Sequence, residues 1–138
     1  MKASEFCRKW IKEPTRDRRN GNIFAQGGTL YSYGTHYPLA RVHGHLLLVN
    51  STPYSVSTAR HQIRARSAGL NAGLTVVTVP VPDVIGSVDA RYNSDCLKGE
   101  ARALREKASR ARKHKQQYLD YAKRVDDMLE AHDSYFNI

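Results

Sequence analysis

The sequence predicts an α+β fold: a small antiparallel β-meander with a short N-terminal helix, one middle helix and a long C-terminal helix. Three patterns indicate this fold. Runs of strand-forming residues separated by glycine-containing turns occupy residues 22–50. Apolar residues at helical spacing mark residues 3–12, and a sustained repeat of alternating steps of four and three marks residues 95–132. At 138 residues, the chain is long enough for one domain with its own core.

The N-terminal part is predicted to begin with a helix over residues 3–12, which a loop connects to the meander. Phe6 and Trp10 share one face of this helix, and Pro14 ends it. The middle helix begins near residue 57, where Ser55 or Ser57 can cap it, and runs to about residue 68. The remaining expected elements are strands at 23–25, 30–33, 37–42, 45–49 and 75–79, and loops at 14–21, 50–56 and 80–96.

The C-terminal segment carries a seam of small and apolar residues in which Lys115 is the only charged member. The seam comprises Leu97, Ala101, Leu104, Ala108, Ala111, Lys115, Tyr118, Ala122, Val125 and Leu129. This spacing is typical of a coiled coil or an antiparallel helix pair. One helix over residues 95–132 would be more than about 50 Å long, because each residue adds about 1.5 Å. We therefore expect an α+β body at 1–94 and a long helix at 95–138. That helix either belongs to the same domain or acts as an arm for docking or for homo-oligomerisation through the 97–129 seam.

Composition limits the partners and the compartment. The chain has 22 Lys and Arg against 13 Asp and Glu, a formal charge of +9. Nucleic acid is the first polyanion to expect, an acidic protein surface the second and a membrane surface the third. No apolar run approaches the ~20 residues of a membrane span, and the first ten residues lack the apolar region of a signal peptide. Cys7 and Cys96 are interpreted as free thiols, so a cytoplasmic location is expected.

Basic residues are concentrated in two helical segments, which makes them candidates for binding a phosphate backbone. The nucleic-acid-binding candidates are Arg60, Arg64, Arg66, Arg102, Arg105, Lys107, Arg110, Arg112, Lys113 and Lys115. Contacts of this kind position a protein on nucleic acid without reading its sequence. The alternative is an ordinary solvated helix face. In addition, no Asp or Glu occurs between Asp17 and Asp83, so a two-carboxylate hydrolase or a carboxylate-bridged Mg²⁺ site would need acids from elsewhere in the chain.

One segment concentrates polar and aromatic side chains in a recognisable order. The relevant positions are Tyr31, Ser32, Tyr33, Gly34, His36, Pro38, Leu39, Ala40, Asn50, Tyr54, Ser55, Thr58 and His61, with Ser57 where the pattern often has Thr. This order resembles a pattern in uncharacterised small proteins and domains encoded by bacteriophages: Tyr-Ser-Tyr-Gly-x-His-x-Pro-Leu-Ala, then Asn, then Tyr-Ser-x-Thr-Thr-x-x-His. The resemblance covers about a quarter of the chain. It implies a phage-type protein in the host cytoplasm, and it implies no particular activity.

The same segment offers candidate sites. A helix N-terminus presents free N–H groups, so Ser57 and Thr58 with Arg41 nearby form a candidate phosphate site, although serine and threonine are also what an ordinary helix start requires. His36 and His61 are weak catalytic candidates, as an acid and base pair acting on a phosphate.

Two other features of the segment point to ordinary structure. The order His43-Gly44-His45 is interpreted as a turn, and no metal site is expected. The tyrosines at 31, 33, 37 and 54 could stack on bases, although tyrosines of a meander are more often half-buried in the sheet.

We therefore expect a basic phage-type protein that binds nucleic acid through its basic helices, and neither an enzyme nor a cofactor-binding protein. The alternative is a phage-encoded inhibitor or interaction protein that binds a host enzyme or a defence complex, as anti-CRISPR proteins do. A third hypothesis is a metal-independent, nuclease-like enzyme that uses His36 and His61.

Overall fold

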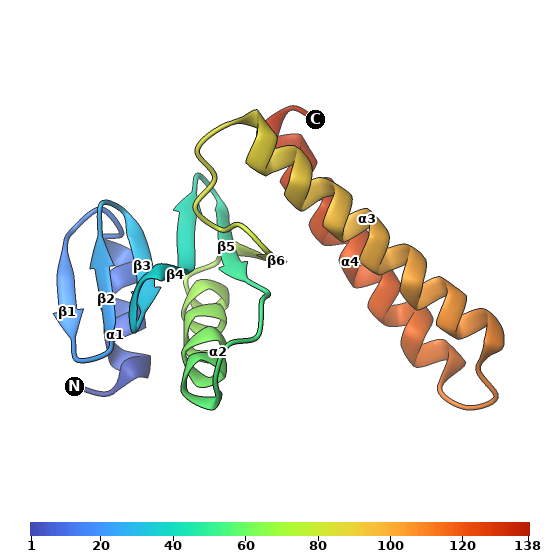
Figure 1. Cartoon of the computed structure of the whole chain (residues 1–138), viewed down its shortest axis with the longest axis horizontal. Helices are drawn as coiled ribbons and strands as arrows, with labels where there is room; N and C mark the ends of the chain where they lie inside the picture. The colour runs from blue at the N-terminus through green and yellow to red at the C-terminus, as the bar shows by residue number, and fades with distance from the viewer. The chain divides into compact units, whose positions relative to one another are not determined.

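The structure, a computed structural model, describes residues 1–138 and divides into two compact units, Met1–Val84 and Ile85–Ile138. The first unit is an α+β unit and the second consists of two helices, so the predicted α+β class is confirmed (Figure 1). The second unit begins ahead of the predicted boundary at residue 94. None of the four helices combines the length and the apolar character that a membrane-spanning helix needs.

The first unit contains one six-stranded sheet in which the strands lie in the order of the chain. Its strands are β1 (Arg18–Asn20), β2 (Ile23–Gln26), β3 (Thr29–Ser32), β4 (Gly34–His43), β5 (Leu46–Asn50) and β6 (Thr75–Val79). Strands β1 to β5 pair antiparallel through short turns, whereas β6 pairs parallel to β5. The parallel pair follows from the intervening helix α2 (Val56–Asn71), because a helical crossover returns the chain to the starting end of the sheet.

Helix α1 (Ala3–Lys12) and helix α2 pack against each other and cover the sheet (Figure 1). Phe6 and Trp10 of α1 are buried in the core, as the sequence predicts. Helix α2 contributes small residues, Ala65, Ala68 and Gly69, which let its backbone approach the strands closely. The remaining core positions come from β2 to β5, so burial of apolar surface is the main stabilising term of this unit.

The second unit is a helical hairpin of α3 (Ser87–Arg110) and α4 (Lys115–Phe136), which corrects the prediction of one helix over residues 95–132. The chain reverses at residues 111–114, where His114 adopts a left-handed conformation with φ +66°. The physical reason is the seam: one extended helix would leave its small residues in water, whereas folding back buries them. Ala101, Ala108 and Ala122 are at most 3 % exposed. The seam is therefore buried between α3 and α4 of the same chain.

Two loops of the prediction contain regular structure. The loop expected at 14–21 includes β1, which pairs with β2 as an edge strand despite its polar sequence. The loop expected at 80–96 ends at Gly86, where α3 begins. An edge strand pairs with a neighbour on one side only and can be polar, so it lacks the apolar pattern by which a strand is recognised in a sequence.

Candidate functional site

A chain of hydrogen bonds links the end of β3 to the first turns of α2. The Ser32 hydroxyl lies 2.8 Å from His61 Nδ1 and 3.3 Å from the Thr58 hydroxyl. Ser55 caps α2 by accepting from the Thr58 N–H at 3.1 Å, and its own hydroxyl donates to Thr58 Oγ1 at 3.1 Å. Ser32 and Thr58 are fully buried. The hydroxyl groups therefore hold the His61 ring in a fixed orientation.

The hydrogen bond from Ser55 to Thr58 favours one direction for this chain and one tautomer of His61. Because Ser55 donates to Thr58, the Thr58 proton is free for Ser32, and the Ser32 proton is free for Nδ1 of His61. We infer that the neutral ring carries its proton on Nε2. Burial lowers the pKa of His61 from its ordinary 6.5, so the neutral form is favoured at neutral pH.

The lowered pKa of His61 predicts a stability that depends on pH. The unfolded chain takes up a proton at this position near pH 6.5, while the folded chain resists it until lower pH. We expect the first unit to be fully stable at pH 7.5 and less stable at pH 5, because the contribution is lost as the pH falls toward the folded pKa. Urea denaturation followed by fluorescence of the single tryptophan, Trp10, measures this difference. A His61→Gln variant should show a smaller difference, and an equal difference would contradict the prediction.

Tyr33 lies next to this network in a backbone conformation that tyrosine rarely adopts. Its φ is +70°, in the left-handed region, at an expected cost of about 1–2 kcal/mol. Its N–H donates to the Asn22 carbonyl at 2.6 Å, and its ring, 44 % exposed, stacks on His61 with 5.9 Å between ring centroids. Backbone strain of this kind concentrates at functional sites.

A polar cavity of about 390 Å³ lies beside His61, between α2 and the start of α1. We call it the basic cavity. Its lining residues are Lys2, Ala3, Ser4, Tyr33, Ser57, Arg60, His61 and Arg64. Three of these side chains are cationic and none is acidic. The cavity therefore suits an anionic ligand rather than a cation or an apolar molecule.

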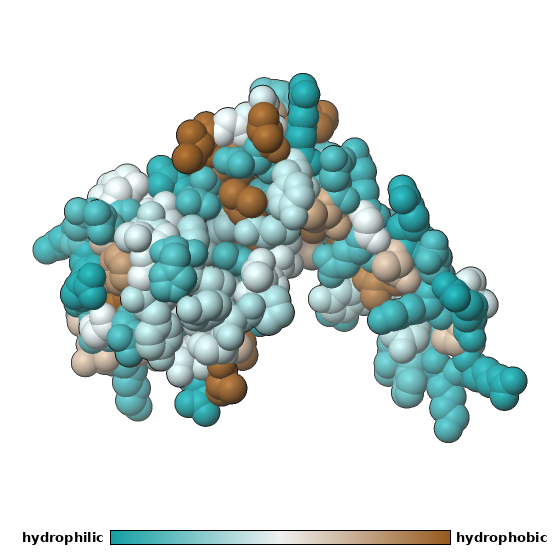
Figure 2. Space-filling view, viewed as in Figure 1, coloured by the Kyte–Doolittle hydropathy of each residue, from teal (hydrophilic) through white to brown (hydrophobic).

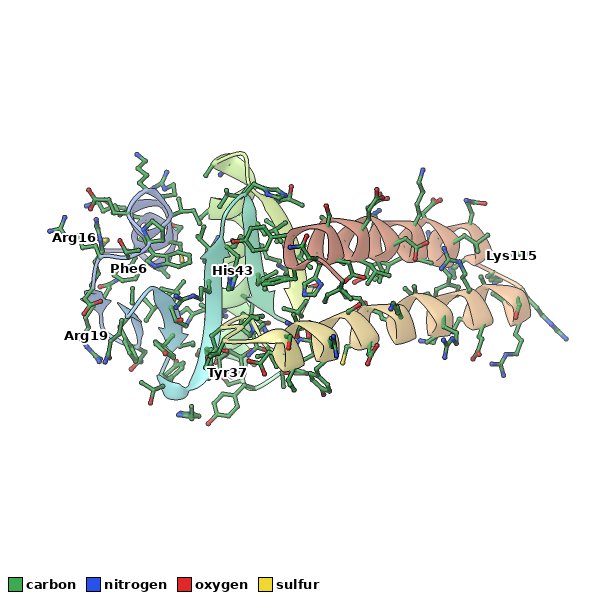
Figure 3. The ribbon with its side chains drawn as sticks, turned by 90° about the horizontal axis from the view of Figure 1, so that it is seen from above. Phe6, Arg16, Arg19, Tyr37, His43 and Lys115 are labelled. Atoms are coloured by element: carbon green, nitrogen blue, oxygen red, sulfur yellow. The ribbon has the colours of Figure 1, made fainter.

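A second polar cluster on the neighbouring strands supports the structure. The Tyr37 hydroxyl donates to the Thr52 carbonyl at 2.6 Å and accepts from Gln62 at 2.8 Å, and burial raises the pKa of Tyr37. The Asn50 amide donates to the Pro38 carbonyl at 2.7 Å. Tyr37 lies on β4 together with His43 (Figure 3). These contacts fix the turn between β5 and α2, so they position the site without forming part of it.

The two histidines proposed as an acid and base pair do not share the cavity. His36 Nε2 lies 3.2 Å from the Tyr54 hydroxyl, whereas His61 is bound to Ser32. Only His61 lines the basic cavity. The nuclease hypothesis needs both imidazoles on one phosphate, and this geometry does not provide that arrangement.

The three residues expected to form a phosphate site at the start of α2 do not lie together in one site. Thr58 is fully buried and its hydroxyl is used within the protein. Arg41 donates to the Gly27 carbonyl at 2.9 Å and to the Thr29 hydroxyl at 2.8 Å, so it holds the β2–β3 turn. Of the three predicted residues, only Ser57 lines the cavity, where it is joined by Arg60 and Arg64 from the same face of α2.

Lys2, the N-cap residue of α1, and Ser4 of its first turn also line the cavity, although neither was among the predicted site residues. A lysine directly before a helix is an unusual N-cap, because it has no acceptor to offer the free N–H groups. This unusual N-cap is the sequence feature that could have pointed to Lys2 as a site residue. His43 Nε2 donates a hydrogen bond to the Pro82 carbonyl at 2.8 Å, and no group of three or more His, Cys, Asp or Glu lies together.

The hairpin gathers the other basic candidates around the turn between its helices. Lys115 lies at this turn (Figure 3), and the same end of the hairpin is mostly hydrophilic (Figure 2). Two of the candidates have carboxylate partners. Arg105 pairs with Asp126 across the two helices, and Arg110 lies 3.7 Å from Glu106. Arg105 is therefore mainly a link between α3 and α4, although its side chain is exposed. Arg102 and residues 112–115 are exposed as well.

No protein-family model, curated protein or solved structure matches the chain.

Proposed function

We propose that this protein binds nucleic acid and that the turn of the helical hairpin makes the principal phosphate contacts. The observation that carries the proposal is the charge around the turn. Residues 107–119 hold five cationic side chains and no Asp or Glu. We call these five residues the basic tip: Lys107, Arg110, Arg112, Lys113 and Lys115.

Helix electrostatics supports a functional origin for the basic tip. Lys107 and Arg110 lie at the C-terminus of α3, where cations are favourable. By contrast, Lys113 and Lys115 lie at the N-terminus of α4, whose first turn has no acid and whose N-cap residue makes no side-chain cap bond. Cations at that end cost about 0.3–1 kcal/mol each. A polyanionic ligand would compensate for this cost, so the charges are better explained by binding than by stability.

The mode of binding is contact with the phosphate backbone. Lysine and arginine side chains on exposed helix ends reach phosphates flexibly, and such contacts position the protein without sequence preference. Arg60, Arg64 and Arg66 add exposed charge on α2. The segment 18–82 contains no acid, so that charge is not neutralised along the chain. From the resemblance to phage-encoded proteins, we propose further that this nucleic-acid-binding protein is of the phage type.

The proposal is tested by fluorescence anisotropy with labelled DNA and RNA at increasing salt. We expect binding at about 50 mM salt that weakens steeply, because each neutralised phosphate releases counterions. Replacing two cations of the tip, Arg112→Gln with Lys113→Gln, should lower the magnitude of the slope of log K against log salt by about 2 on duplex DNA.

The hairpin supplies a matched control for this variant. Lys123 and Arg124 form another exposed, adjacent Lys and Arg pair on α4, away from the turn. Lys123→Gln with Arg124→Gln removes the same charge and should leave the slope nearly unchanged. Equal losses in the two double variants would show that only net charge matters. If no DNA or RNA binds at about 50 mM salt, and a host protein is retained after nuclease treatment, the inhibitor alternative is favoured.

A further inference from the structure

The basic cavity holds positive charge that the protein itself does not neutralise. Arg60 and Arg64 are one helical turn apart on α2, and Lys2 faces them from the start of α1. None of the three has a carboxylate within ion-pair distance among the pairs formed in residues 1–138. Like charges at this helical spacing are destabilising. An anion in the cavity would relieve that repulsion.

Two ionisable groups of α1 outside the lining, Glu5 and Cys7, do not supply the missing negative charge. Arg64 is close enough to influence Cys7, but burial raises the pKa of this thiol to about 12, so Cys7 stays neutral. Glu5, in the first turn of α1, pairs with Lys9 at 3.7 Å and does not line the cavity. The charge of the cavity is therefore available for an external ligand.

The uncharged polar groups of the cavity are able to donate hydrogen bonds. Ser4 and Ser57 contribute hydroxyl groups, and Nε2 of His61 is a donor in the tautomer whose Nδ1 accepts from Ser32. The N-cap residue of helix α1 makes no side-chain cap bond, so it supplies no acceptor to the first N–H groups of the helix. Cations and donors together match a ligand that has several acceptor oxygens, which is the chemistry of a phosphate group.

Tyr33 adds a flat aromatic surface to this cavity. Its ring is part of the lining and keeps 44 % of its surface exposed, even though the backbone is strained to hold it there. Exposed tyrosine rings are the common stacking surface for unpaired nucleobases. A phosphate ligand bound here would thus be accompanied by a base rather than by an aliphatic or peptide group.

We propose that the basic cavity binds the terminal phosphate of a nucleic-acid strand, with the adjacent base stacked on Tyr33. A terminal phosphate carries close to two negative charges at neutral pH, whereas an internal phosphodiester carries one. Three unneutralised cations suit the more highly charged group. The proposal rests on the proposed nucleic-acid binding and names a second, end-specific site in the N-terminal unit.

The test uses single-stranded oligonucleotides of one sequence with a 5′-phosphate, a 3′-phosphate or hydroxyl groups at both ends. Binding to the full-length protein is measured by competition against a labelled strand. We expect one phosphorylated form to bind about tenfold more tightly than the unphosphorylated strand. Arg60→Gln and Arg64→Gln should each abolish this preference. Arg66→Gln is the matched control, because Arg66 is exposed on the same helix but does not line the cavity. Circular dichroism checks that each variant is folded.

Each outcome separates the two proposals. Equal affinity for phosphorylated and unphosphorylated strands would overturn the terminal-phosphate site and leave binding by the basic tip intact. A preference lost equally in the Arg66→Gln variant would also overturn it, since the effect would then be diffuse electrostatics. Inhibition by inorganic phosphate as strong as by the phosphorylated strand would contradict the stacking role of Tyr33. No binding of any strand would contradict both proposals.

Discussion

We expect Ala122→Glu to unfold the helical hairpin while the N-terminal unit stays folded. Ala122 is fully buried in the seam between α3 and α4, so the variant forces a carboxylate into a space sized for a methyl group. Burying an unpaired charge costs about 3 kcal/mol or more, a large part of the stability of a small unit. The helices α3 and α4, with 24 and 22 residues, hold most of the helical structure, so the circular dichroism at 222 nm should fall sharply.

Trp10 makes this experiment specific to one unit. It is the only tryptophan in the chain and is fully buried in the core of the first unit. Its fluorescence should therefore remain that of the native protein when the hairpin melts. Ala103→Glu is the control, because Ala103 is exposed on α3 and should accept the same change with little effect. Simultaneous loss of both signals would mean that the two units do not fold independently.

We expect Gly69→Leu to destabilise the first unit while the helical hairpin stays folded. A Cβ atom on Gly69 would lie 2.5 Å from Leu47 Cδ2 and 3.1 Å from Val76 Cγ2. Leu47 is fully buried, so it has no free space into which to move. Overpacking by one or two methylene groups typically costs about 1–3 kcal/mol, and a whole leucine side chain exceeds that range. Native Trp10 fluorescence should be lost at a much lower urea concentration, while most of the helical signal persists.

Gly99→Leu is the matched control for Gly69→Leu, because it makes the same change in a helix of the second unit. It lies within α3, and a Cβ built there meets nothing within 4 Å. Gly99→Leu should therefore raise the stability of the hairpin by about 0.5–1 kcal/mol, because glycine is a poor helix former. If both leucine variants raised stability, helix propensity would outweigh the close approach of α2 to β5 and β6, and the prediction for Gly69→Leu would be wrong.

The elements that could be predicted from the sequence are those with a strong local signal. The strand at 75–79 was predicted with its observed bounds, because a run of β-branched residues ends at Pro80. The seam was found as well, since nine of its ten positions are buried or half-buried and only Lys115 is exposed. The reversal at 111–114 was not found. It has no glycine or proline, and it results from the two halves of the seam packing together.

The residues of the candidate site also fall into two groups, those that the sequence could indicate and those that it could not. The motif order drew attention to Ser32, Thr58 and His61, and the structure joins these three by hydrogen bonds. Which residues face one cavity depends on tertiary packing, so Arg41 and His36 were grouped with the site although they lie elsewhere. Lys2 and Ser4 could not be predicted as partners of α2, because only the packing of α1 on α2 brings them there.

The sequential order of the sheet has a consequence for how the first unit assembles. Every pair of neighbouring strands is also consecutive along the chain, so most pairings form between short stretches of polypeptide. Such topologies reach the native state quickly, because little loop-closure entropy is lost before each contact is gained. The β5–β6 pair is the exception, since α2 must first bridge the two strands. We therefore expect β6 to dock last, which makes closure of that edge the rate-limiting step of the unit's folding.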